Sequence, residues 1–95
     1  MGVPVIAMAG VTHAGRVGVS LLSRVGLAEC IAPDPQGYVT IATELANDIQ
    51  RLTELRASLR AMVASSSLCD APAFARDVEV AYRHMWHTWC RKPDV

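Results

Sequence analysis

The chain has 95 residues, of which 52% are hydrophobic and 19% are charged. This composition excludes a disordered tail and allows one small domain. Nine basic residues balance nine acidic ones, so nothing in the net charge would attract the chain to nucleic acid or to an anionic membrane.

The cysteines and the hydropathy pattern indicate the compartment. Cys30, Cys69 and Cys90 are odd in number and far apart, which favours free thiols in a reducing environment. No apolar run approaches the roughly 18 residues of a membrane span, and the N-terminus lacks the basic region of a signal peptide. We therefore expect a soluble cytoplasmic protein.

The first third of the chain predicts a strand, a helix and a second strand. An apolar run over residues 2–10 leads directly into helix-like residues 14–22, the helix ends at Gly26, and a second apolar run covers residues 29–32. Such a β-α-β unit places its strands parallel and side by side. Parallel strands occur almost only in sheets that are covered on both faces and flanked by further strands. The pattern therefore predicts the end of a larger α/β domain, whose remainder precedes Met1.

From about residue 35 the chain is expected to be helical. Asp34 followed by Pro35, then Asp48, then Asp70, are the expected N-caps of three helices. Their apolar stripes are Tyr38, Ile41, Ala42 and Leu45; Leu52, Leu55, Leu59 and Met62; and Phe74, Val78, Ala81, Tyr82, Met85 and Trp89. Charged side chains outside the second stripe are expected to face solvent: Arg51, Glu54, Arg56 and Arg60. We expect the three helices to pack back across the domain.

Several short motifs occur in an order that a known family shares. They are residues 2–5 (Gly-Val-Pro-Val), residues 10–22, residues 25–27, Tyr38-Val39, residues 66–70 and residues 81–86. The second of these is similar to a Gly-x-Thr-x-x-Ser-Arg-Val loop and helix. Together the motifs resemble the bacterial relatives of O-linked N-acetylglucosamine transferase, and the resemblance covers essentially all 95 residues.

The resemblance implies a GT-B glycosyltransferase, in which two Rossmann-like lobes hold UDP-N-acetylglucosamine between them. The intact enzyme would transfer the sugar to Ser or Thr of proteins, which a tetratricopeptide-repeat segment presents, and no metal is expected. Residues 1–95 would be the C-terminal part of the catalytic domain, a β-α-β unit of the second lobe followed by three helices. Its implied partners are the N-terminal part of that domain and the protein acceptors.

The chain also departs from the family pattern. A His-Thr-Thr run, an acidic residue that grips the nucleotide, the lysine that holds the diphosphate and the whole N-terminal lobe are absent. Gly15 stands where the family usually has Ser, and Ser67 where it usually has Pro. We therefore expect a fragment without catalytic residues that is inactive alone, left by a truncated gene, a misplaced start codon or a degraded paralogue.

The loop between the first strand and the first helix holds the candidate substrate-binding residues Gly10, Thr12, His13 and Arg16. Ligands of open α/β sheets bind at the carboxyl ends of strands, where helix N-termini attract anions. A cation in the first helical turn opposes the helix dipole, which suggests that Arg16 contacts a phosphate or a carboxylate. The alternative is that Thr12 only caps the helix and that Arg16 only pairs with a neighbouring carboxylate.

Two other groups of side chains on the last helix favour structural roles. His84, His87 and Cys90 recur every third residue, but positions three and six apart on a helix diverge by about 60° and 120°, so a shared metal ion is disfavoured. The aromatic stripe that includes Tyr82, Met85, Trp86 and Trp89 is expected to anchor the helix in the core. If the upstream half of the domain is missing, part of this surface is expected to be an exposed patch that favours aggregation. A rival hypothesis is a small α-rich interaction module that binds a partner through this Trp/Met surface.

Overall fold

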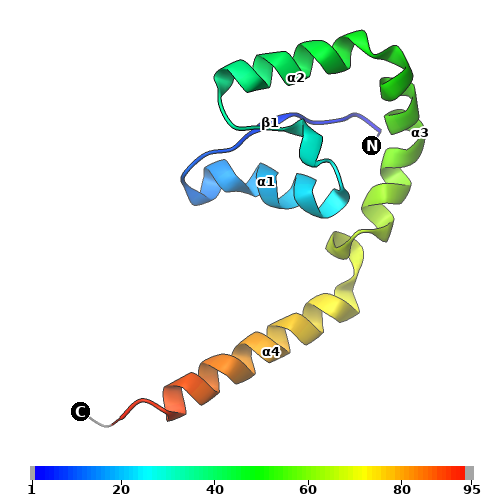
Figure 1. Cartoon of the computed structure of the whole chain (residues 1–95). Coiled ribbons are helices and arrows are strands. Elements are labelled where there is room, and N and C mark those ends of the chain that lie inside the picture. Colours follow the sequence, from blue (N-terminus) through cyan, green and yellow to red (C-terminus); the bar gives the residue numbers. More distant parts are fainter. Residues whose placement is uncertain (1, 94–95) are drawn as a thin grey trace.

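The computed structural model describes residues 2–93 and is mostly helical, with one small sheet (Figure 1). In chain order the elements are β1 (Ala7–Met8), α1 (His13–Val25), the 3-10 turn η1 (Ala28–Cys30), β2 (Ile31–Ala32), α2 (Pro35–Asn47), α3 (Ile49–Ser65), the 3-10 turn η2 (Ser67–Cys69) and α4 (Ala71–Cys90). The predicted order of strand, helix, strand and three helices is confirmed. None of the helices within residues 2–93 combines the length and the apolar character needed to cross a bilayer.

The two strands pair in parallel, as the β-α-β pattern predicts. Ala7 lies opposite Ile31 and Met8 opposite Ala32, with α1 as the crossover. The paired segments are shorter than the apolar runs. Two residues of each run take part in the ladder. Glu29 was expected in the second strand and instead lies in η1, where the Cys30 N–H donates to the Leu27 carbonyl at 2.9 Å and closes a turn.

The predicted helix ends are confirmed because local side chains determine them. Four side-chain oxygens accept a hydrogen bond from the backbone N–H three residues later: Thr12 from Gly15, Asp34 from Gly37, Asp48 from Arg51 and Asp70 from Ala73. Each such bond satisfies an N–H group that has no partner inside the helix. Gly26 ends α1 in the left-handed conformation, with φ of 89°.

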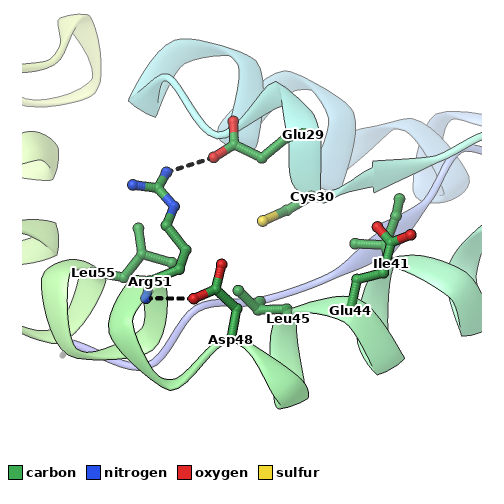
Figure 2. A pocket seen from close by; sticks show the side chains of 8 residues that line it. All are labelled: Glu29, Cys30, Ile41, Glu44, Leu45, Asp48, Arg51 and Leu55. Atoms are coloured by element: carbon green, nitrogen blue, oxygen red, sulfur yellow. Dashed lines mark hydrogen bonds and ion pairs between the residues drawn. The ribbon is translucent and has the colours of Figure 1, made fainter.

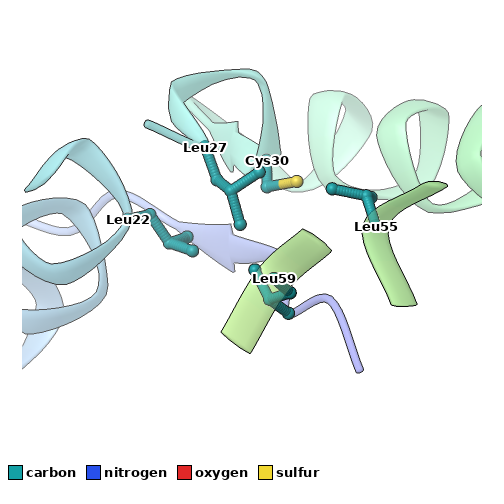
Figure 3. Close-up of a cluster of buried hydrophobic side chains, with 5 residues drawn as sticks. All are labelled: Leu22, Leu27, Cys30, Leu55 and Leu59. Carbon is teal, nitrogen blue, oxygen red and sulfur yellow. The ribbon is translucent and has the colours of Figure 1, made fainter. Parts of the chain in front are cut away.

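The core is small and lies where α1, η1 and α3 meet (Figure 3). It consists of the buried side chains Leu22, Leu27, Cys30, Leu55 and Leu59. The predicted stripe of α3 is therefore confirmed at Leu55 and Leu59, with Leu52 and Met62 half-buried beside them. On α2 the stripe is half-buried at Ile41, Ala42 and Leu45, whereas Tyr38 is exposed.

The last helix contradicts the expectation that it packs back into the core. α4 contacts η2 and then runs away from the other elements (Figure 1), leaving Phe74, Tyr82 and Trp89 66–68% exposed. The radius of gyration is 18.4 Å, against about 12 Å for a compact domain of this length. Helical periodicity identified an apolar face correctly, but nothing in the period specifies what covers that face.

The contact between α1 and β1 requires a residue without a side chain at position 18, which is Gly18. A Cβ atom on Gly18 would lie 2.8 Å from the Cβ atom of Ala7 on β1, closer than two such atoms approach in proteins. Glycine at this position therefore lets the crossover helix lie directly on the strand that it follows.

We expect Gly18→Ala to destabilise the chain, although alanine is the better helix former by about 1 kcal/mol. The added methyl must push α1 off β1, which should lower the free energy of unfolding by about 1–3 kcal/mol. Urea titrations followed by circular dichroism check this. In an Ala7→Gly background the same substitution should cost less, because the opposing methyl is gone. Equal costs in both backgrounds would contradict the packing argument.

Candidate functional site

The four candidate residues lie together in the loop that joins β1 to α1. Gly10 follows β1, Thr12 caps α1, His13 is its first helical residue, and Arg16 lies in its first turn. The loop thus occupies the carboxyl end of a parallel strand and the N-terminus of a 13-residue helix. The position matches the one from which the sequence predicted ligand binding, and binding itself stays a prediction.

Backbone hydrogen bonds hold the loop in a narrow turn. The Gly10 N–H donates to the Gly15 carbonyl at 2.8 Å, and the Gly15 N–H donates to the Thr12 Oγ1 at 3.2 Å. A Cβ atom on Gly10 would lie 2.9 Å from the Gly15 Cα, so the two backbones touch. The Thr12 hydroxyl therefore has a structural role as the cap, whatever else it contacts.

Arg16 is exposed and has no acidic neighbour at ion-pairing distance among residues 2–93, where both recorded ion pairs belong to Arg51. This part of the chain therefore does not supply the carboxylate that the structural alternative requires. Beside Arg16 lies an open hollow of about 260 Å³, lined also by His13, Val17, Ser20 and Leu21. Its lining includes one cation, one imidazole and one hydroxyl, although most of the lining surface is apolar.

A second cavity, of about 190 Å³, lies between η1 and the junction of α2 with α3 (Figure 2). Its polar lining is dominated by an ion pair in which Arg51 Nη2 lies 2.6 Å from Glu29 Oε1. Arg51 was expected to face solvent, and its side chain is 40% exposed, but the ion pair with Glu29 was not expected. The residues are 22 positions apart, and no periodic pattern connects a residue in a turn with one on a later helix.

Pairing and burial shift the pKa values of three groups in this cavity. The hydrogen bond from Arg51 holds the pKa of Glu29 below its usual range, with a smaller contribution from a backbone hydrogen bond. The same hydrogen bond raises the pKa of Arg51. Burial raises the pKa of the Cys30 thiol, so this cysteine stays protonated and is a poor nucleophile.

The histidines and cysteines of the last helix do not converge. His84, His87 and Cys90 are all exposed on α4. Across the portion of the chain that the structure describes, no three His, Cys, Asp or Glu side chains gather in a way that could hold a metal ion. The three cysteines are free thiols, with Cys30 buried and Cys69 and Cys90 exposed.

We expect Glu29→Gln to lower the stability at pH 7 and to have a smaller effect at pH 3. Because the pKa of Glu29 is lower in the folded than in the unfolded state, its contribution is complete above the unfolded value of 4.5. That contribution is lost as the pH falls through the lower folded value. Thermal unfolding at both pH values checks this.

The matched control is Glu44→Gln, which removes another carboxylate from the lining of the same cavity. Glu44 makes no recorded ion pair within residues 2–93. Its replacement should leave the stability unchanged at both pH values. A wild-type advantage over Glu29→Gln that is as large at pH 3 as at pH 7 would contradict the ion-pair explanation.

Known proteins resemble this chain in both sequence and structure. A family model described as Glycosyl transferase family 41 matches residues 1–78. The probable UDP-N-acetylglucosamine–peptide N-acetylglucosaminyltransferase SPINDLY of Eustoma exaltatum subsp. russellianum is 50% identical over 96% of this chain and 10% of its own length. The corresponding protein of Arabidopsis thaliana is 47% identical over 96% of this chain and 10% of its own.

A solved structure shares the arrangement of the elements. A mutant of the Thermobaculum terrenum O-GlcNAc transferase superimposes with a TM-score of 0.84 at 40% identity, over 96% of this chain and 18% of that one. The chain spans about a tenth of the length of the curated relatives. The resemblance stated from the sequence motifs is confirmed, and the chain belongs to glycosyl transferase family 41.

Proposed function

We propose that these 95 residues form the C-terminal part of the donor-binding, Rossmann-like lobe of a GT-B enzyme. The intact enzyme would transfer N-acetylglucosamine from UDP to Ser or Thr side chains of proteins. The observation that carries the proposal is 50% identity, spread over 96% of the chain, to a relative named as a peptide N-acetylglucosaminyltransferase. The 0.84 TM-score to a solved O-GlcNAc transferase supports it, since that match also extends over nearly the whole chain.

In this proposal the loop from Gly10 to Arg16 faces the donor. The loop lies at the carboxyl end of β1, where nucleotides bind in open α/β sheets. Arg16 carries a positive charge that no carboxylate within residues 2–93 neutralises. The diphosphate of the donor is negatively charged, and a guanidinium at this position would help to hold it. The chain itself supplies no group proposed to take part in the chemistry.

The remainder of the catalytic domain is the proposed partner of the sheet. Val3 and Val5, which precede β1, are 67% and 61% exposed. They line an apolar hollow of about 230 Å³ together with the buried Leu22, Leu27 and Leu59. A parallel sheet of two strands leaves faces and edges that a larger sheet covers. This hollow is where the rest of the lobe would pack.

We expect the isolated 95-residue chain to bind UDP more weakly than micromolar and to transfer no sugar. The reason is that it lacks the upstream residues that grip the nucleotide in the family. Calorimetric titration with UDP and a radiolabelled transfer assay check both points. Micromolar binding to the purified chain would overturn this view.

Replacing the matching segment of the Thermobaculum terrenum enzyme with this chain should preserve transferase activity. In that chimera Arg16→Ala should raise the KM for the sugar nucleotide about tenfold or more, since hydrogen bonds to charged groups contribute about 1.5–3 kcal/mol. Arg24→Ala is the control, because Arg24 lies in the last turn of the same helix, far from the loop. Equal effects of the two substitutions would remove Arg16 from the donor site.

A further inference from the structure

The loop between β1 and α1 is attached to the sheet through the backbones of two glycines. The Ala9 N–H donates to the Ala32 carbonyl at 2.8 Å, so the pairing of the two strand segments reaches the residue before the loop. The next N–H along the chain, that of Gly10, donates to the Gly15 carbonyl at 2.8 Å. Two consecutive N–H groups therefore join the end of the first strand to the second strand and to the first turn of α1.

The contact between Gly10 and Gly15 requires space and not an unusual backbone conformation. Among residues 2–93, positive φ angles occur at Gly2 and Gly26, so the two loop glycines hold angles that other residues also adopt. A Cβ atom on Gly10 would lie 2.9 Å from the Gly15 Cα, and one on Gly15 would lie 2.9 Å from the Gly10 Cα. Ordinary contacts of a Cβ atom begin at 3.4 Å, so this arrangement of the loop excludes a side chain at either position.

A side chain at position 10 would displace the start of α1. The three atoms nearest to its Cβ are the Cα, the carbonyl carbon and the carbonyl oxygen of Gly15, and backbone atoms cannot rotate away as the end of a side chain can. Arg16 follows Gly15 directly in the helix and moves with it. The Arg16 side chain has no recorded ion pair within residues 2–93, so its placement there depends on the backbone that carries it.

We propose that Gly10 is a positioning residue, which holds Arg16 in place for the sugar-nucleotide donor through the backbone contact with Gly15. The inference rests on the donor role proposed for Arg16 and adds how the guanidinium is placed. Gly10 was expected to take part in substrate binding. Here its part is indirect, because its N–H is already bonded within the loop. A loop that is ordered before the ligand arrives binds more tightly, since less conformational entropy is lost on binding.

Kinetics of the chimera with the Thermobaculum terrenum enzyme test this role. Gly10→Ala should raise the KM for the sugar nucleotide about tenfold, because ordering one backbone residue on binding costs about that factor. The kcat should change by less than about twofold, since the loss concerns binding. A purely structural role would instead lower the amount of folded enzyme, and with it the apparent kcat, while the KM stayed unchanged.

A double substitution shows whether Gly10 acts through Arg16. In an Arg16→Ala background, Gly10→Ala should raise the KM by less than about twofold, because no guanidinium remains to be placed. Gly37→Ala is the control. Its methyl would lie 3.1 Å from two neighbouring atoms at the start of α2, which follows the other strand and lies outside the donor loop. It should leave the KM unchanged.

Amide hydrogen exchange of the full 95-residue chain tests the backbone contact without any substitution. The Gly10 N–H should exchange about as slowly as the Ala9 N–H, since both have carbonyl partners. It should exchange about tenfold or more slowly than the Val11 N–H, for which no partner is recorded within residues 2–93. Equal exchange at Gly10 and Val11 would overturn the proposal even if Gly10→Ala does not fold.

The kinetic outcomes separate this inference from the proposed function. If Arg16→Ala raises the KM and Gly10→Ala does not, the positioning role is wrong and the donor role of Arg16 stands. If neither substitution changes the KM, both roles are wrong. If Gly10→Ala and Gly37→Ala raise the KM equally, the effect comes from general loosening of the helix starts, and the positioning role is again wrong.

Discussion

Parallel pairing of β1 with β2 is the constraint on which the rest of the described structure depends. A parallel pair needs a crossover, and here α1 supplies it by lying directly on the first strand. The crossover fits because Gly18 carries no side chain where Ala7 approaches. Leu55 and Leu59 of α3 then cover the end of α1 and the turn before β2. A two-stranded sheet with one crossover helix buries few side chains, and among residues 2–93 the core cluster has five.

Features encoded by neighbouring residues were predictable from the sequence. The caps at Thr12, Asp34, Asp48 and Asp70 lie where the sequence predicted them, because each involves a side chain and an N–H three residues away. The β-α-β order followed from apolar runs and from Gly26. Strand lengths did not follow, because the extent of a ladder is set by the partner strand and not by the apolar run itself.

Features that join distant parts of the chain were not predictable. The ion pair of Glu29 with Arg51 joins residues 22 positions apart, and both looked like ordinary surface charges. The stripe from Phe74 to Trp89 was recognised as apolar, yet its expected place in the core was wrong. The candidate loop is intermediate. Its position follows from the strand end and the helix start, whereas ligand binding by the loop stays a prediction.

The burial of one thiol has a practical consequence. Cys30 is 2% exposed at the centre of the core, whereas Cys69 and Cys90 are open to solvent. Alkylating reagents attack thiolates, and they reach a buried one when the surrounding structure opens. When Cys69 and Cys90 are blocked, the labelling rate of Cys30 measures how often the core opens. Cys30 is therefore a natural reporter of local opening of the core, and no added probe is needed.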